Sequence, residues 1–227
     1  MTETFDEVWE ERYAGDPAYR NHYPWSAVVT FLLQKHPFQK GREETDVLEI
    51  GCGTGNNLWC AAREGFRVSG VDGSQTAIAY ANAWFDREEL SGDLRVGDFT
   101  SLPFSDNSFD LAFDRAAISL TTREGAQVAV GELARVVKPG GRVFLTPYSD
   151  RCSSFHKVSD GDGVIRDIQI GSVTGSGGQV RFYGKQEVYD LFDARWRILS
   201  LKHVEETEMT SPGRMIHAEW HVVAERL

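Results

Sequence analysis

The sequence predicts an α/β fold in which helices cover both faces of a doubly wound, mostly parallel sheet. Between residues 46 and 146, short apolar runs alternate with amphipathic helical segments, a pattern typical of parallel strands joined by crossover helices. A second observation is the run VLEIGCGTGN at 47–56, where a strand pattern ends in glycines at alternate positions and a helical pattern follows. Such glycines let the backbone turn tightly and approach a ligand closely, and the helix start offers free N–H groups.

Two helices are expected before the first strand. Residues 5–14 carry apolar and aromatic side chains at helical spacing, and Gly15 follows as a stop signal. A second helix is predicted at 26–36, where Pro24 suits the first turn and apolar residues again recur at helical spacing. Both helices therefore precede the glycine run.

The remaining elements follow in order along the chain. Strands are predicted at 46–50, 67–71, 93–96, 109–113 and 141–146, with helices at 56–64, 74–86 and 123–137. The glycine-rich stretch 150–184 is expected to hold an inserted hairpin with strands at 164–170 and 180–183 and a turn near 174–178. A short helix at 185–193 leads to strands near 196–204 and 215–224, which we expect to pair antiparallel.

Length and composition restrict the class of protein. A chain of 227 residues with 41% hydrophobic and 26% charged residues fits one globular α/β domain. Its net charge of −10 argues against a nucleic-acid partner, because proteins that neutralise phosphates carry a basic face. The apolar runs are too short to span a membrane, and the acidic N-terminus is unlike a signal peptide. We therefore expect a cytoplasmic protein with no membrane partner.

The three cysteines show neither metal-site spacing nor a paired framework. We accordingly predict no metal site. Cys52 lies inside the glycine run, where we favour a small residue tolerated beside the backbone over a reactive thiol.

Two acids follow strands downstream of the glycine run. Asp72 ends the stretch 67–72, about twenty residues after the glycines, where a doubly wound sheet places a carboxylate against ribose hydroxyls. Asp98 ends the next strand pattern, and farther on a helical segment stops at residues 139–141 (Pro-Gly-Gly) before a β-rich run. A strand-end acid is also common as a helix cap or turn former, so that interpretation of Asp72 stays open.

The ordered combination of the glycine run, the two acids and the Pro-Gly-Gly turn resembles the class I S-adenosylmethionine (SAM) dependent methyltransferases. More narrowly, the chain is similar to the small-molecule methyltransferases of the type 11 group. The resemblance covers about residues 46–146. It implies a seven-stranded Rossmann-like sheet whose last strand is antiparallel, with SAM as cofactor and S-adenosyl-L-homocysteine as product. On this basis the single domain divides into a helical lid (1–45), a cofactor-binding core (46–146), a substrate-side insertion (147–184) and a part that closes the sheet (185–227).

The resemblance also implies roles for individual residues. Glu49 would partner the cationic end of the cofactor through water, Asp72 would accept both ribose hydroxyls, and Asp98 would accept the adenine amino group with Phe99 beside it. A carboxylate suits these tasks because it accepts hydrogen bonds and cannot donate them. The other expected cofactor contacts are Tyr23, Gly51, Cys52, Gly53, Asn56, Gly73 and Asp114.

The acceptor side is expected from residues 147–184 and the N-terminal helices. Its candidates are Trp25, Arg115, Tyr148 and Arg181. Asp114 and Arg115 are open to another interpretation, in which they pair with each other at the surface. No catalytic residue is identified.

A general base, where the acceptor needs one, would come from the histidines. His22 is favoured because it adjoins the expected lid, and His156 lies in the insertion; His217 and His221 are the other titratable candidates. Each of them is also compatible with a purely structural role.

We therefore expect SAM-dependent methyl transfer to a small molecule, at oxygen. A non-catalytic module that binds SAM or its product is the main alternative. A nicotinamide-dependent oxidoreductase is disfavoured, because Asn56 and Asn57 stand where a dinucleotide fingerprint has its third glycine. The inserted hairpin is also suited to a contact between two copies of the chain, which would make a homodimer.

Overall fold

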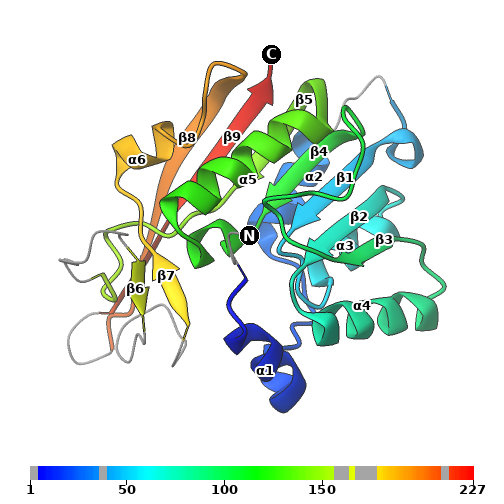
Figure 1. Ribbon diagram of the computed structural model, residues 1–227, viewed down its shortest axis with the longest axis horizontal. Helices are drawn as coiled ribbons and strands as arrows, with labels where there is room; N and C mark the ends of the chain where they lie inside the picture. Colours follow the sequence, from blue (N-terminus) through cyan, green and yellow to red (C-terminus); the bar gives the residue numbers. More distant parts are fainter. Residues whose placement is uncertain (1–4, 36–39, 156–163, 167–177, 211–214) are drawn as a thin grey trace.

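A seven-stranded sheet forms the centre of the computed structural model, which describes residues 5–35, 40–155, 164–166, 178–210 and 215–227 (Figure 1). The strand order is β3-β2-β1-β4-β5-β9-β8. The strands are β1 (Asp46–Ile50), β2 (Arg67–Asp72), β3 (Asp93–Val96), β4 (Phe109–Asp114), β5 (Val137–Leu145), β8 (Trp196–Thr207) and β9 (Ile216–Arg226). β9 runs antiparallel to both neighbours, while the pairs from β3 to β5 are parallel. The predicted sheet, with its antiparallel last strand, is confirmed.

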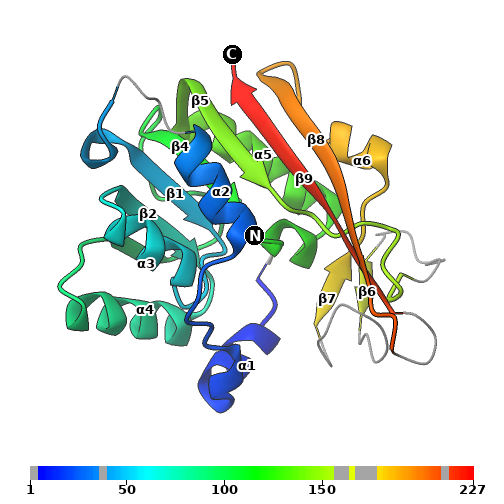
Figure 2. The ribbon, with the colours of Figure 1, turned by 180° about the vertical axis from the view of Figure 1, so that it is seen from behind.

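Helices cover both faces of this sheet. They are α1 (Val8–Gly15), α2 (Ser26–Lys35), α3 (Asn56–Arg63), α4 (Gln75–Arg87), α5 (Arg123–Val136) and α6 (Lys185–Tyr189), with 3₁₀ turns η1 (Pro17–Tyr19), η2 (Arg42–Glu44) and η3 (Ala117–Leu120). Figures 1 and 2 show α5 on one face of the sheet and α2 and α3 on the other. None of the helices within the described ranges is long and apolar enough to cross a bilayer.

Alternation along each strand produces two separate hydrophobic cores. Leu48 and Ile50 of β1 belong to the core beneath α5, whereas Val47 belongs to the core beneath α2, α3 and α4. Successive side chains of a strand point to opposite faces, so a strand buried on both faces is apolar at almost every position. Glu49 is the exception in β1 and is buried on the second face with only 1% of its surface exposed, which marks the position as a site rather than a packing residue.

The start of the fifth strand differs from the sequence prediction. The fifth strand was expected to begin after the Pro-Gly-Gly turn, yet β5 already begins at Val137, which pairs with Phe109 of β4. Regular pairing resumes with Leu111 and Arg142, and Gly140 adopts φ +77 in between. Glycine permits this left-handed conformation, so the turn forms a bulge inside the strand rather than the end of a helix.

The inserted hairpin is confirmed where the structure describes it. β6 (Val164–Arg166) and β7 (Gln179–Arg181) pair antiparallel, with Val164 opposite Arg181. Most of the predicted turn, residues 174–177, lies outside the described residues.

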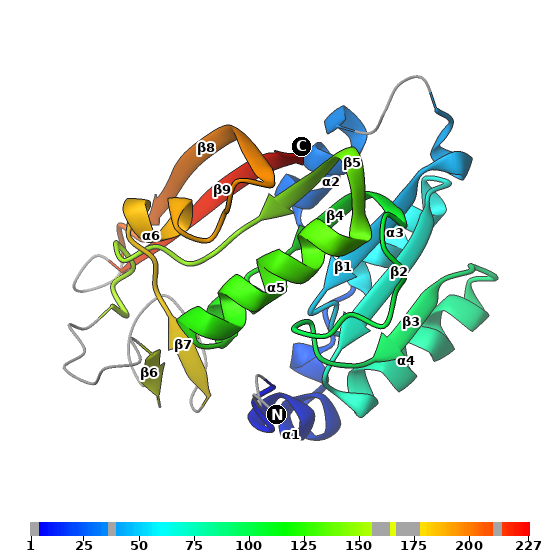
Figure 3. The ribbon, with the colours of Figure 1, turned by 45° about the horizontal axis from the view of Figure 1, so that its top comes forward.

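The two N-terminal helices have different positions. α1 lies across the end of the sheet, beneath the carboxyl ends of the strands (Figures 1 and 3). α2 packs against the sheet, with the Phe31 ring stacked on Phe144 at 5.2 Å between centroids. α1 therefore lies over the strand ends and α2 packs into the core, while the lid role of residues 1–45 stays a prediction.

Candidate functional site

Two adjoining cavities lie beyond the carboxyl ends of β1, β2 and β4, where the strand order changes direction. The first measures about 170 Å³ and the second about 600 Å³. Trp9, Tyr13, Gly51, Arg115 and Tyr148 line both, so the two cavities form one continuous site. Ligands of open α/β sheets bind at this switch point. The sequence analysis expects the cofactor there, and that assignment stays a prediction.

The glycine run forms the wall of this site. Gly51, Gly53 and Gly55 all adopt positive φ, at 64°, 51° and 81°. A Cβ on Gly51 would lie 2.2 Å from the Cβ of Ala117, and one on Gly53 would lie 2.6 Å from the hydroxyl of Tyr13. Both conformation and space therefore require glycine at these two positions.

Asp72 ties this loop to the end of β2. Its Oδ2 accepts the N–H of Gly53 at 2.8 Å, and its Oδ1 accepts the N–H of Ser74 at 2.8 Å. Burial raises the pKa of the Asp72 carboxyl, although the two N–H donors oppose that effect. The N-cap of α4 is Ser74, whose hydroxyl accepts the N–H of Ala77. Asp72 is therefore not the helix cap, but its bond from the Ser74 N–H, two residues on, forms a turn, as the alternative interpretation allowed. Asp72 also supports the glycine loop and lines the first cavity.

Glu49 places a carboxylate in the second cavity. Its Oε1 accepts a hydrogen bond from Nδ2 of Asn57 at 2.7 Å, while Oε2 is buried and has no partner among the residues that the structure describes. Burial raises the pKa of Glu49 well above its usual range, and the charges of Asp114 and Asp72 add to the effect. An acceptor left unpaired in a buried site is costly, so this atom suits a ligand that brings a donor or a positive charge.

α1 closes the site from the N-terminal side. Glu10 accepts hydrogen bonds from the Ser74 hydroxyl at 2.5 Å, from the Thr76 hydroxyl and from the Thr76 N–H at 3.2 Å. At the preceding turn, Asp6 accepts the N–H of Gln179 at 2.8 Å. The N-terminal segment is thus fixed to the start of α4 on one side and to the inserted hairpin on the other.

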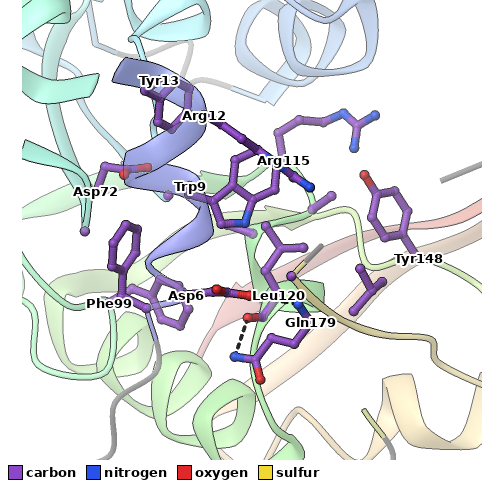
Figure 4. Close-up of a pocket in the computed structure, with 17 residues that line it drawn as sticks. Asp6, Trp9, Arg12, Tyr13, Asp72, Phe99, Arg115, Leu120, Tyr148 and Gln179 are labelled. Carbon is purple, nitrogen blue, oxygen red and sulfur yellow. Dashed lines mark hydrogen bonds between the residues drawn. The ribbon is translucent and has the colours of Figure 1, made fainter. Parts of the chain in front are cut away.

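The aromatic side chains of this segment enter the site. Figure 4 shows Trp9, Arg12 and Tyr13 facing the strand ends, with Tyr148 and Gln179 on the opposite side. The sequence analysis predicted the helix but did not assign these three N-terminal residues to the site. Within α1 no residue is buried, and this clustering of aromatic residues on a helix without a buried face is the signal that could have identified them.

Most of the predicted cofactor contacts meet in these cavities. Glu49, Gly51, Cys52, Gly53, Asn56, Asp72, Gly73 and Phe99 line one or both of them. The Cys52 thiol is buried, and burial raises its pKa well above the usual range, which agrees with the interpretation as a small packing residue.

Three predicted contacts lie outside the cavity walls. Tyr23 is 78% exposed, and its carbonyl accepts a hydrogen bond from Nδ2 of Asn56 at 2.6 Å. Asp98 accepts the N–H and hydroxyl of Thr100 at 2.8 and 2.7 Å. Asp114 is fully buried beneath the site, where its Oδ1 accepts the N–H of Ile118 at 3.0 Å. Direct cofactor contacts by these three side chains stay predictions.

On the acceptor side, three of the four candidates line the second cavity: Trp25, Arg115 and Tyr148. Arg115 lies 3.9 Å above the Trp25 ring and pairs with Glu219 at 3.4 Å, not with Asp114. The fourth candidate, Arg181, lies away from both cavities and pairs with Glu187 at 2.6 Å.

The histidine candidates are dispersed. His22 packs at 5.3 Å against Trp84, and its Nε2 lies 3.2 Å from the Tyr80 hydroxyl, away from both cavities. His156 lies outside the described residues. His217, which the sequence offered only as a further titratable group, lines the second cavity.

Comparison with known proteins finds similarity to methyltransferases. Residues 47–141 match the family described as "Methyltransferase domain". The chain is 28% identical over 195 residues to a 24-methylenesterol C-methyltransferase of Oryza sativa subsp. japonica, covering 76% of this chain and 52% of that protein. It is 34% identical over 120 residues to a malonyl-[acyl-carrier protein] O-methyltransferase of Erwinia billingiae, covering 52% of this chain and 44% of that protein.

Among solved structures, a SAM-dependent methyltransferase of Methanosarcina mazei superposes with a TM-score of 0.68 at 22% identity, covering 83% of this chain and 95% of that chain. At that identity the likeness concerns the fold. The chain spans about half the length, or less, of the curated relatives it matches.

Proposed function

We propose that this chain is a class I SAM-dependent methyltransferase acting on a small molecule, because residues 47–141 match the methyltransferase-domain family. The observation that carries this proposal is the pair of buried acids, Glu49 and Asp72, on either side of a glycine loop within one site.

The chemistry of these residues fits SAM, which has an ammonium, a sulfonium and a ribose diol but no phosphate. The unpartnered Oε2 of Glu49 suits the ammonium group, directly or through water. Asp72 keeps lone pairs on both oxygens beyond those used by Gly53 and Ser74, so it is able to accept the ribose hydroxyls. When bound, SAM supplies a methyl group activated by a positively charged sulfur.

The chain's own contribution is to bind, align and exclude water. The glycine loop allows close approach of the ligand to the backbone, and α1 covers the strand ends. Fixing the two reactants in one orientation lowers the activation free energy of such a displacement by about 7 kcal/mol in well-aligned systems.

We propose that the acceptor is a small molecule methylated at oxygen. A cavity of about 600 Å³ lies within the usual range for small-molecule sites. Trp25 offers an aromatic wall, while Arg115, Tyr148 and His217 offer polar groups that suit a hydroxyl. The net charge of −10 argues against a nucleic-acid acceptor.

Calorimetric titration of the full chain with SAM, S-adenosyl-L-homocysteine and NADH tests the cofactor assignment. Saturable binding of both adenosyl ligands, with dissociation constants on the order of micromolar, and no binding of NADH are expected. Binding of NADH alone would overturn the proposal. Binding of both adenosyl ligands without conversion of SAM to S-adenosyl-L-homocysteine in the presence of any small-molecule acceptor would favour the non-catalytic binding module.

We expect Glu10→Gln to speed the dissociation of S-adenosyl-L-homocysteine about fivefold, because weakening a charge-assisted contact by about 1 kcal/mol frees α1 from α4. Stopped-flow displacement measures the rate. Glu11→Gln is the matched control on the same helix, since α1 places Glu11 among its exposed residues. Equal rates for the wild type and both variants would remove the lid role of this contact.

A further inference from the structure

Three polar side chains of β9 lie together, and the first of them, His217, lines the second cavity. His217, Glu219 and His221 alternate along the strand and therefore share one face of the sheet. Nε2 of His221 lies 2.6 Å from Oε1 of Glu219, and Nε2 of His217 lies 3.4 Å from Oε2. Arg115 approaches the same Oε2 at 3.4 Å. The Glu219 carboxylate thus contacts two imidazoles and one guanidinium.

This carboxylate is held in its ionised form. Only 8% of Glu219 is exposed. Burial by itself would raise the pKa of Glu219, but the hydrogen bonds from His217 and His221 and the positive charge of Arg115 outweigh it and hold this pKa well below its usual range. Glu219 therefore accepts hydrogen bonds from its neighbours.

An ionised carboxylate fixes the tautomer of each imidazole. Because it only accepts hydrogen bonds, the proton of a neutral His217 lies on Nε2, and Nδ1 keeps its lone pair. The two histidines then differ in their surroundings. His221 packs edge-on against the Phe144 ring at 5.4 Å and lines a separate groove beside α2. His217 lines the second cavity together with Trp25 and the Glu49 carboxylate.

We propose that His217 is the general base for the acceptor, with Glu219 as its positioning residue, and that the acceptor is a hydroxyl compound of phenol or enol type. This inference rests on the proposed methyltransferase function. In the step assigned to His217, the acceptor O–H bond breaks, the proton moves to Nδ1, and the electron pair stays on the oxygen. Arg115, in the same cavity, favours the resulting oxyanion.

Charged and titratable groups of both signs surround His217. Glu206 of β8 stands opposite His217 in the strand register and lines the same cavity, so its negative charge stabilises an imidazolium. The Tyr148 ring meets His217 edge-on at 5.7 Å, and Glu219 and Arg115 complete the surroundings. Within the described ranges, no three His, Cys, Asp or Glu side chains are arranged to hold a metal ion.

The probe for this proposal is 4-nitrophenol, whose ionised form is coloured, added to the full chain saturated with S-adenosyl-L-homocysteine. At pH 6 we expect the bound phenol to be ionised at least about fivefold more than the free phenol, because His217 accepts its proton. His217→Gln and His217→Asn should return the ionised fraction to that of the free phenol. Glu219→Gln should remove most of the increase in phenol ionisation without changing the size of the cavity.

His203→Gln is the matched control, since His203 is a histidine of the adjacent strand that bonds to Ser149 at 2.7 Å and lines neither cavity. It should retain the wild-type ionisation. Nitrogen-15 NMR of the labelled full chain provides a second readout, in which His217 should carry its proton on Nε2 in the wild type and lose that preference in Glu219→Gln.

Three results would overturn the inference: no saturable binding of 4-nitrophenol, an unchanged ionised fraction in both His217 variants, or a His217 proton on Nδ1. Calorimetry with S-adenosyl-L-homocysteine separates this failure from that of the proposed function. If the wild type binds that ligand and the phenol result is negative, only the His217 assignment falls. If the wild type does not bind it, the methyltransferase proposal itself falls.

Discussion

Replacing Asp72 with alanine is expected to weaken the binding of S-adenosyl-L-homocysteine by about 100-fold. Two hydrogen bonds from ribose hydroxyls to a charged carboxylate contribute about 1.5 kcal/mol or more each, and both are lost together. The substitution also removes the acceptor for the N–H groups of Gly53 and Ser74, which hold the glycine loop in its binding conformation. Calorimetry on the folded variant measures the loss.

Two further variants serve as comparisons for Asp72→Ala. Asp72→Asn keeps the shape and one acceptor oxygen, so its loss should be smaller than that of the alanine variant. Asp93→Ala removes an exposed strand acid that pairs with Arg95 at 2.6 Å and lines neither cavity, so its affinity should stay within about twofold of wild type. If Asp72→Ala folds and binds within about twofold of wild type, the ribose assignment is wrong.

The parts of the site carried by local backbone chemistry were predictable from the sequence. Gly51 adopts φ +64 and has no space for a Cβ, so only glycine fits this position and the sequence shows it directly. Acids at strand ends are equally informative, because parallel strands bring their carboxyl ends to one edge of the sheet. Glu49, Asp72 and Gly53 therefore meet in the structure as the motifs indicate.

The parts that depend on long-range packing were not predictable in this way. Tyr13 reaches Gly53 only because Glu10 fixes α1 to Ser74 on a distant helix. Likewise, His217 enters the site because β9 inserts between β5 and β8, which places the strand beside Arg115. Sequence spacing shows which residues share a face, but it does not show which distant element that face will meet.

Asp114 is a predicted cofactor contact that lines neither cavity, so its contact with the ligand stays a prediction. Its strand position places it below the cavity floor, where it is fully buried and its Oδ2 has no hydrogen-bond partner among the described residues. Burial raises the pKa of Asp114 from 3.8 to about 7, although the N–H of Ile118 and the charge of Arg115 oppose the rise. The residue is therefore a titratable group inside the core, with consequences for stability.

Replacing Asp114 with asparagine is expected to flatten the dependence of stability on pH. Because the folded-state pKa is raised, the folded protein holds more protons than the unfolded chain between pH 3.8 and about pH 7. The contribution of Asp114 to the free energy of unfolding is therefore fully present below pH 3.8 and falls as the pH rises through about 7, by about 4 kcal/mol over the whole interval. Between pH 6 and pH 8.5 the loss is about 1.4 kcal/mol.

Urea unfolding of the full chain at pH 6 and pH 8.5 measures this difference. The wild type should lose about 1.4 kcal/mol more than Asp114→Asn between the two values. The charge of Asp114 also raises the pKa of Glu49. Removing that charge therefore lowers the pKa of Glu49, which further increases the difference in pH dependence between the wild type and Asp114→Asn. Asp93→Asn, at an exposed strand position, should follow the wild-type profile. Parallel profiles for the wild type and Asp114→Asn would mean that Asp114 is ionised in the folded protein throughout this range. That result would require a cation or a hydrogen-bond donor at its Oδ2.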